Sequence, residues 1–206
     1  MKLVCLDLEG VLVPEIWIGL ADRTGIDALR RTTRDNPDYD VLMRDRIRLL
    51  DEHGLEISDL QQVVSEMKPL RGALSFLKRL EPQFQIVVLS DTFYELAMPL
   101  MKILGWPTLL CHRLITEGGR ITGYQQRQED PKRSAVTAFQ SLNLRVIAAG
   151  DSYNDISMLT QADEGILFRA PSGVLANYPA FKVVNNYRAL GDAIEAASER
   201  LDGNSV

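Results

Sequence analysis

The sequence has few cysteines, no long apolar run and no excess of basic residues, and each absence argues against a class of protein. The 2 cysteines among 206 residues, Cys5 and Cys111, have no His or Cys nearby at metal-ligand spacing, which argues against a Cys-His metal site. Both stand in apolar runs, so we expect buried free thiols. No apolar run approaches the roughly 20 residues that cross a bilayer, and Asp7 comes too early for the apolar region of a signal peptide. We therefore expect a soluble, cytoplasmic protein with no membrane partner.

Basic residues are fewer than acidic ones, 23 Lys and Arg against 28 Asp and Glu, which gives a formal charge of -5. A non-specific nucleic-acid binder needs a basic face, so we expect no nucleic-acid partner. The content of 46% hydrophobic and 25% charged residues is ordinary for a folded protein. The length suits one large domain, or one domain that carries an insertion.

Short apolar runs alternate with helical patterns along most of the chain. The runs span residues 3–6, 85–89, 145–149 and 165–168, and the helical patterns span 93–104, 131–141, 154–162 and 187–201. Runs that are apolar on both faces are typical of parallel strands covered by helices. The sequence therefore predicts a doubly wound, mostly parallel α/β sheet, with a hairpin around Glu117-Gly118-Gly119.

One stretch, from residue 14 to residue 68, contains helical patterns and no strand-like run. Pro37-Asp38 predicts the start of one helix, and Ser58 with Gln61 predicts a capping box at the start of the next. We expect four short helices inserted after the first strand. The predicted division is an α/β core of residues 1–13 and 69–206 and a helical cap of residues 14–68.

Acidic and polar side chains stand where the predicted strands end. Asp7 and Glu9 end the first strand, Ser90 ends the second, and Asp151 and Asp155 follow the third. Any one of them alone would be read as an N-cap or turn residue. In an open α/β sheet, however, ligands bind beyond the carboxyl ends of the strands. Converging carboxylates repel one another unless a cation lies among them, and oxygen ligands of this kind suit Mg²⁺.

These residue types support one kind of chemistry. With a metal present, the Asp7 carboxylate can attack phosphorus and form an aspartyl-phosphate. Ser90 and Lys132 are the available donors for the charge on the transferring phosphoryl group.

The motifs that contain these residues resemble those of a known family. Asp7-Leu8-Glu9-Gly10-Val11 resembles the first motif of the haloacid dehalogenase superfamily of phosphotransferases, Ser90 the second, Lys132 the third, and Gly150-Asp151-Ser152-Tyr153-Asn154-Asp155 the fourth. The order and spacing match over nearly the whole chain. The helical insertion after the first motif and the run from Asn154 to Leu159 are similar to phosphoserine phosphatases.

The resemblance implies roles for the matched residues. Asp7 is expected to be the nucleophile, and Glu9 to protonate the leaving alcohol and then deprotonate the acceptor. The expected Mg²⁺ ligands are Asp7, Glu9 through its backbone carbonyl, and Asp151, with Asp155 orienting a metal-bound water or the Lys132 ammonium. Ser90, Lys132 and Asn154 are expected to bind the phosphoryl oxygens.

The resemblance also reaches into the predicted cap. Glu15 matches the family's contact to a substrate amine and Arg46 its contact to a substrate carboxylate, which together complement an amino acid. Glu15 could instead be a first-turn helix acid, and Arg46 could pair with Asp45 or Glu52 on a solvated face. Met43 either lines the same pocket or fills core space.

Two departures from the phosphatase pattern bear on function. Glu9 stands where an Asp is usual, and Asp91-Thr92 follows Ser90 where two glycines are usual. The Asp91 carboxylate should point away from an anionic substrate, or accept a bond from an acceptor's ammonium or hydroxyl. Both departures occur in a subgroup that resembles this chain, the phosphoserine phosphatases that also transfer the phosphoryl group to homoserine. Homoserine has one methylene more than serine, which a pocket discriminates by only about 1–3 kcal/mol.

The sequence therefore predicts a Mg²⁺-dependent phosphoserine phosphatase that also transfers phosphoryl groups to homoserine. One alternative keeps the fold and changes the substrate to a phosphosugar or a nucleotide. Another is a phosphorylatable receiver domain, although such a domain is shorter and has no helical insertion after its first strand. The sequence does not indicate an oligomeric state.

Overall fold

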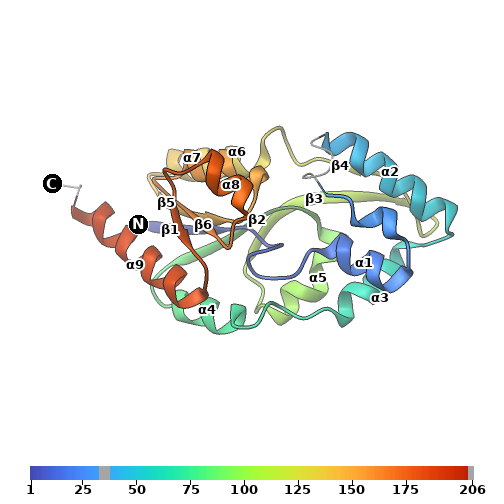
Figure 1. Cartoon of the computed structure of the whole chain (residues 1–206), viewed down its shortest axis with the longest axis horizontal. Helices are drawn as coiled ribbons and strands as arrows, with labels where there is room; N and C mark the ends of the chain where they lie inside the picture. Colours follow the sequence, from blue (N-terminus) through green and yellow to red (C-terminus); the bar gives the residue numbers. More distant parts are fainter. Residues whose placement is uncertain (33–37, 204–206) are drawn as a thin grey trace.

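The computed structural model describes residues 1–32 and 38–203, and they are built around a seven-stranded sheet (Figure 1). The strand order is β4-β3-β2-β1-β5-β6-β7. Neighbouring strands run parallel, except that β4 is antiparallel to β3. The strands are β1 (Lys2–Leu6), β2 (Gln85–Phe93), β3 (Thr108–Glu117), β4 (Arg120–Gln125), β5 (Arg145–Gly150), β6 (Glu164–Phe168) and β7 (Lys182–Val184). The predicted mostly parallel α/β sheet is confirmed, and so is the hairpin, which β3 and β4 form.

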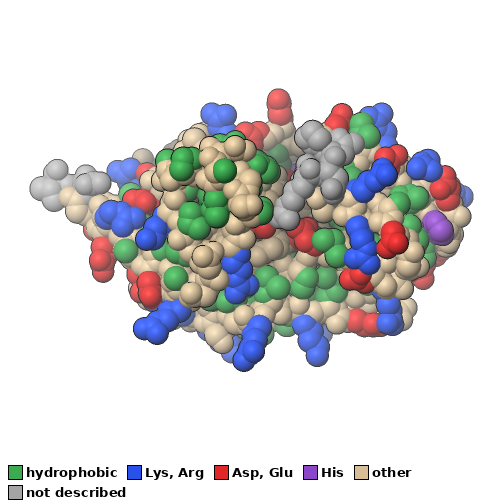
Figure 2. Space-filling model, viewed as in Figure 1, with side chains coloured by type: hydrophobic (Ala, Val, Ile, Leu, Met, Phe, Trp, Pro, Cys, Tyr) green, Lys and Arg blue, Asp and Glu red, His purple; other side chains and the backbone are tan. Residues whose placement is uncertain are grey.

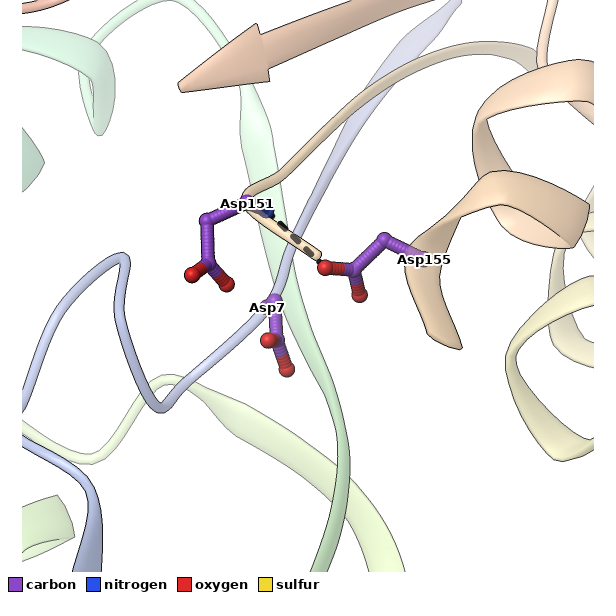
Figure 3. Close-up of side chains that lie close together, drawn as sticks. All are labelled: Asp7, Asp151 and Asp155. Carbon is purple, nitrogen blue, oxygen red and sulfur yellow. Dashed lines mark hydrogen bonds between the residues drawn. The ribbon is translucent and has the colours of Figure 1, made fainter. Parts of the chain in front are cut away.

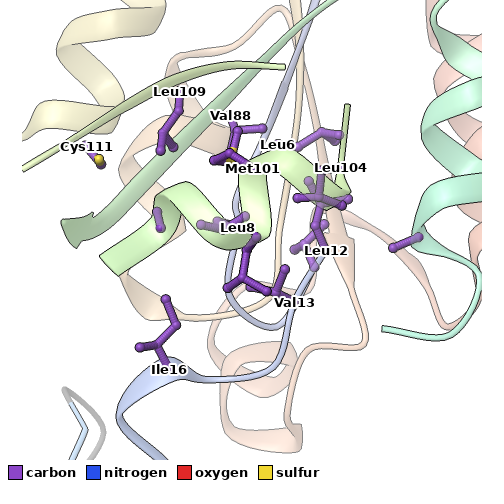
Figure 4. Packing of buried hydrophobic residues seen from close by; sticks show 14 of the residues in the cluster. Leu6, Leu8, Leu12, Val13, Ile16, Val88, Met101, Leu104, Leu109 and Cys111 are labelled. Carbon is purple, nitrogen blue, oxygen red and sulfur yellow. The ribbon is translucent and has the colours of Figure 1, made fainter. Parts of the chain in front are cut away.

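The sheet separates two hydrophobic cores, because successive residues of a strand point to opposite faces. In β1, Leu3 and Cys5 belong to one core while Val4 and Leu6 belong to the other. Helices α6 (Pro131–Ser141), α7 (Ile156–Gln161) and α8 (Ser172–Asn177) cover the first core, and α4 (Ala73–Leu80), α5 (Tyr94–Ile103) and α9 (Tyr187–Gly203) cover the second. Figure 4 shows Met101 and Leu104 packed beside Leu6 and Val88 in the second core.

Both cysteines are buried free thiols, as predicted. Burial raises the pKa of the Cys5 thiol to about 12, and burial likewise raises the pKa of Cys111. Both side chains are therefore protonated at neutral pH and fill core space.

The segment between β1 and α4 is helical, as predicted. It forms α1 (Ile16–Thr24), a 3₁₀ turn at Asp27–Arg30, α2 (Tyr39–Glu52) and α3 (Ile57–Glu66), and the described residues from 14 to 68 form no strand. The Asp38 side chain caps α2 by accepting a bond from the Val41 N–H at 3.0 Å. Pro37, which was expected to open this helix with Asp38, lies outside the described residues. No helix among the described residues is long and apolar enough to cross a membrane.

These helices lie beside the antiparallel edge of the sheet (Figure 1), where α2 contacts β4 and α3 contacts α5. Two side-chain bonds join α2 to β4, from the Tyr124 hydroxyl to the Asp40 carboxylate and from the Arg120 guanidinium to the Asp51 carboxylate. Helix α2 is therefore fixed to the edge strand of the sheet.

The predicted capping box at Ser58 and Gln61 is wrong. Helix α3 begins at Ile57, and the Glu56 N–H donates to Asp59 Oδ2 at 2.8 Å. The Ile57 N–H donates to the Gly119 carbonyl in the β3–β4 turn at 2.9 Å. This long-range bond fixes where the helix begins, so Ser58 lies inside the first turn.

Acidic and basic side chains are interspersed over the face of the molecule seen in Figure 2. Some form exposed ion pairs, such as Arg48 Nη1 with Glu52 Oε1 at 2.6 Å. Exposed pairs contribute at most about 1 kcal/mol each. The stability of the fold therefore depends mainly on the two cores.

The packing of α7 on β6 requires glycine at position 165. A Cβ there would lie 2.6 Å from the Leu159 carbonyl oxygen, which is α7 backbone. We expect Gly165→Ala to lower the free energy of unfolding by about 1–3 kcal/mol, because α7 must shift to make room. In the control Gly123→Ala, the nearest atom would lie 3.5 Å from the new Cβ. Urea unfolding measures the two variants, and equal midpoints would contradict this account.

Candidate active site

Three buried carboxylates meet at the carboxyl end of the sheet (Figure 3). Asp7 follows β1 and Asp151 follows β5, which is paired with β1, while Asp155 belongs to the short 3₁₀ turn Tyr153–Asp155. Each offers one oxygen, and these oxygens lie within 4.8 Å of one another. The predicted convergence of these three acids is therefore observed.

Hydrogen bonds fix the Asp155 carboxylate in this cluster. Its Oδ2 accepts the N–H of Asp151 at 2.9 Å and the N–H of Ser152 at 3.0 Å, and Figure 3 shows the first of these bonds. Its Oδ1 accepts a bond from the Lys132 ammonium at 2.7 Å. Asp155 is therefore bonded to Lys132, and its expected role of orienting that ammonium stays a prediction.

Lys132, in the first turn of α6, is only 2% exposed. Its Nζ lies 2.8 Å from Asp7 Oδ1 and 3.6 Å from Asp91 Oδ2. Burial alone would lower the pKa of Lys132, but the carboxylates of Asp155 and Asp7 raise it well above its ordinary value. Lys132 is therefore a buried cation at neutral pH.

The single positive charge of Lys132 does not compensate the negative charges of the three carboxylates in the cluster. Burial raises the pKa of Asp7 well above its ordinary value, and the charges of Asp155 and Asp151 raise it further, while Lys132 opposes the shift. Gly10 leaves room at this point, since a Cβ there would lie 2.5 Å from Asp151 Oδ2. A compact set of carboxylate oxygens with excess negative charge fits a hard divalent cation.

A cavity of about 80 Å³ opens beside Asp7, between the sheet end and helices α1 and α2. Among the predicted residues, its lining includes Asp7, Glu9, Glu15, Arg46, Ser90, Asp91 and Asn154. Ser152 of the fourth motif also lines it, together with residues that no sequence motif indicated, namely Trp17, Thr32, Tyr39 and Leu42. The fold therefore brings most of the predicted site residues to one place.

Three other predicted residues do not line this cavity but contact residues that do. Lys132 donates to Asp7 and lines a second cavity. Met43 is fully buried, with its sulfur 3.7 Å from Nη1 of Arg46. The Thr92 N–H donates to Ser90 Oγ at 3.2 Å, and its hydroxyl has no hydrogen-bond partner among the described residues.

Glu9 lies on the cavity wall, and its carboxylate is not part of the acid cluster. Its Oε1 accepts the N–H of Ile16, the first residue of α1, at 2.6 Å. Burial raises the pKa of Glu9 to about 7, and the charge of Glu15 contributes. A carboxyl group that titrates near neutrality is suited to both giving and taking a proton. The expected metal contact through the Glu9 carbonyl stays a prediction.

Arg46 is buried, with only 5% of its surface exposed, so the solvated alternative does not hold. The neighbouring Arg48 makes the ion pairs with Asp45, at 3.8 Å, and with Glu52. Burial lowers the pKa of Arg46 to about 10, which leaves it charged at neutral pH. Glu15 makes no side-chain capping bond at the start of α1 and lines the cavity instead.

The Asp91 carboxylate is turned towards the site. Its Oδ2 accepts a bond from Asn154 Nδ2 at 2.8 Å, and its Oδ1 lies 3.7 Å from His112 Nε2. The Tyr39 hydroxyl donates to the Asp91 carbonyl at 2.8 Å. His112 and Tyr39 carry no motif in the sequence, so only the fold identifies them as neighbours of the site.

Lys132 allows a test of this charge balance in the metal-free protein. We expect Lys132→Met to lower the free energy of unfolding near neutral pH by about 3–5 kcal/mol, because buried carboxylates lose their partner. The loss should shrink as the pH falls, since acids with raised pKa values take up protons in the folded state first and the repulsion disappears. Urea titrations at about pH 5 and about pH 8 measure this. The exposed Lys78, changed to Met, is the control, and a pH-independent loss would contradict the proposed balance.

Comparison with known proteins identifies the family. A family model for haloacid dehalogenase-like hydrolases matches residues 14–160. The chain is 59% identical over 201 residues to the phosphoserine phosphatase ThrH of Pseudomonas aeruginosa, covering 97% of this chain and 98% of that protein. It is also 59% identical to a phosphoserine phosphatase of Pseudomonas syringae pv. tomato, covering 97% of this chain and 85% of that protein.

Solved structures agree in fold. One is a phosphoserine phosphatase in its apo form, with a TM-score of 0.75 and 22% identity, covering 90% of this chain and 94% of that chain. Another is a phospho-aspartyl intermediate analogue of phosphoserine phosphatase, with a TM-score of 0.76 and 21% identity, covering 92% of this chain and 96% of that chain. The chain therefore belongs to the haloacid dehalogenase-like hydrolase family, and it is an enzyme.

Proposed function

We propose that the protein is a Mg²⁺-dependent phosphoserine phosphatase that works through an aspartyl-phosphate and also transfers the phosphoryl group to homoserine. One observation carries the proposal: the Asp7 carboxylate, paired with Lys132 at 2.8 Å, faces a cavity that also contains Arg46 and Glu15. The names of the two Pseudomonas relatives support the substrate.

In this proposal residues 14–68 are a cap over a core of residues 1–13 and 69–206. Helix α2 brings Arg46 to the cavity, and Glu15 stands directly before α1. The core contributes Asp7, directly after β1, and Ser90, which was expected to end the second strand but lies within β2, because that strand continues to Phe93. Substrate would therefore bind between the two parts, with its phosphoryl group towards the core.

The cavity provides complementary partners for each part of phosphoserine. The Arg46 guanidinium suits the carboxylate and the Glu15 carboxylate suits the ammonium. Ser90, Lys132 and Asn154 are the proposed donors to the phosphoryl oxygens. Met43 and Thr92 support residues that line the cavity. The Met43 sulfur contacts Arg46, and the Thr92 N–H donates to Ser90 Oγ.

The acid cluster fits Mg²⁺, with Asp7, Asp151 and the Glu9 carbonyl as proposed ligands and Asp155 beside them. When bound, the ion supplies positive charge that keeps Asp7 ionised and offsets the charge of the phosphoryl group. Asp155 keeps Lys132 in place through its bond at 2.7 Å. Lys132 in turn donates to Asp7 Oδ1.

In the first half-reaction an Asp7 carboxylate oxygen attacks phosphorus, and the bond from phosphorus to the serine oxygen breaks. Protonated Glu9 gives its proton to that oxygen, so serine leaves as a neutral alcohol. In the second half-reaction the Glu9 carboxylate takes a proton from water or from the homoserine hydroxyl. That oxygen attacks phosphorus and releases Asp7.

The two alternative functions fit the chain less well. The receiver domain is contradicted by the family match over residues 14–160. A phosphosugar or a nucleotide would leave the Arg46 guanidinium and the Glu15 carboxylate without the partners that an amino acid supplies. Asp91 is the proposed contact to the acceptor, since Asn154 turns its carboxylate towards the site.

The nucleophile is tested with Asp7→Asn, which keeps the shape of the side chain and removes its charge. We expect phosphate release from phosphoserine to fall by about a thousandfold or more. Near-normal activity of Asp7→Asn would exclude the covalent mechanism.

Phosphoryl transfer is tested with the wild-type enzyme. With Mg²⁺, phosphoserine and homoserine it should form phosphohomoserine as well as free phosphate, and chelation with EDTA should stop both. Free phosphate as the only product would reduce the enzyme to a phosphatase.

Carboxylate recognition is tested with Arg46→Ala. We expect the KM for phosphoserine to rise roughly ten- to a hundredfold, while the KM for phosphoethanolamine, which lacks only the carboxylate, changes little. Arg48→Ala is the matched control, because Arg48 lies on the exposed face of the same helix. Equal losses on both substrates would contradict the proposed role of Arg46.

A further inference from the structure

We propose that Trp17 is a specificity-determining residue that positions the Arg46 guanidinium for a substrate carboxylate. The inference rests on the proposed function, because it takes Arg46 as the carboxylate contact. Trp17 is 6% exposed and lines the cavity together with Arg46.

Arg46 is a buried cation without a close anionic partner. Among the described residues, no Asp or Glu oxygen lies within 4.0 Å of its guanidinium. Glu9 and Glu15 line the same cavity, and their charges raise the pKa of Arg46 against the effect of burial. Something other than an ion pair must therefore fix the guanidinium in place.

Trp17 supplies one such contact, beside the bond from Arg46 Nη2 to the Arg31 carbonyl. The central carbon of the Arg46 guanidinium lies 4.3 Å from the centroid of the indole ring. The face of an aromatic ring carries negative potential and attracts a cation, most strongly for tryptophan and when both groups are desolvated. The indole face therefore stabilises the charge of Arg46 without occupying its N–H donors.

Some donors of Arg46 have partners in the protein and one has none. Nη2 donates to the Arg31 carbonyl at 2.7 Å, and Nη1 lies 3.7 Å from the Met43 sulfur. Nε is buried and has no hydrogen-bond partner among the described residues. An arginine offers parallel N–H donors to a carboxylate, and an unpaired buried donor favours a ligand that satisfies it.

The position of Trp17 is itself linked to the reacting end of the cavity. Trp17 is the second residue of α1, and the N–H of the first residue, Ile16, donates to Glu9 Oε1 at 2.6 Å. The start of α1 therefore places the proposed acid/base and the support for Arg46 side by side.

The test compares Trp17→Phe and Trp17→Leu. Phenylalanine keeps a weaker aromatic face, while leucine keeps only the apolar character. We expect Trp17→Leu to raise the KM for phosphoserine roughly three- to thirtyfold, with a small change in kcat and in the KM for phosphoethanolamine. Trp17→Phe should recover part of the loss. Trp106→Leu is the matched control, because Trp106 is 60% exposed and away from the cavity.

The results distinguish the role of Trp17 from that of Arg46. Equal effects of Trp17→Leu on both substrates, or a Trp17→Phe variant as impaired as Trp17→Leu, would show a merely structural role and overturn the inference. A selective effect of Arg46→Ala without one of Trp17→Leu would overturn the inference alone. Arg46→Ala without any selectivity would overturn both the proposed carboxylate site and the role of Trp17. Melting temperatures of all variants establish that each is folded.

Discussion

The structure depends on a concentration of negative charge at the carboxyl end of the central strands. Asp7 and Asp151 follow strands that are paired with each other, and Asp155 completes the cluster. The parallel sheet makes this proximity unavoidable once those residues follow those strands. The buried Lys132 ammonium offsets part of the charge of Asp7 and Asp155. Position 10 requires glycine because Asp151 lies too close for any side chain there.

The helical segment buries charges of its own beside the cavity, among them the Arg46 guanidinium. Arg46 is 5% exposed, whereas Arg48 of the same helix is solvated and paired with Glu52. The indole of Trp17 makes that burial tolerable. The two parts meet at Glu9, whose carboxylate accepts the first N–H of α1 and whose pKa of about 7 results mainly from burial.

The sequence allowed prediction of what depends on local pattern and chain order. Apolar runs located β1, β2, β5 and β6, and the acids after β1 and β5 located the cluster of Asp7, Asp151 and Asp155. Prediction failed where distant residues decide the outcome. Helix α3 begins at Ile57 because its N–H reaches Gly119 in a distant turn, and the short elements β7 and α8 carry too little pattern to be recognised. Helix α4 was missed although its buried residues recur at helical spacing. Trp17 was missed because a tryptophan in an apolar helix resembles ordinary core until its stacking on Arg46 is seen.

The attachment of α2 to β4 has a consequence for how this enzyme can diverge. Arg46 belongs to a helix fixed to the antiparallel edge of the sheet, whereas Asp7 follows the central strand β1. The residues proposed to select the ligand and to break the bond are thus attached to different strands of one sheet. Because α2 is bonded to β4, we expect a change in the length or tilt of the β3–β4 hairpin to displace Arg46 more than the acid cluster. Under the proposed roles, remodelling of this edge would alter substrate choice and leave the reacting residues in place.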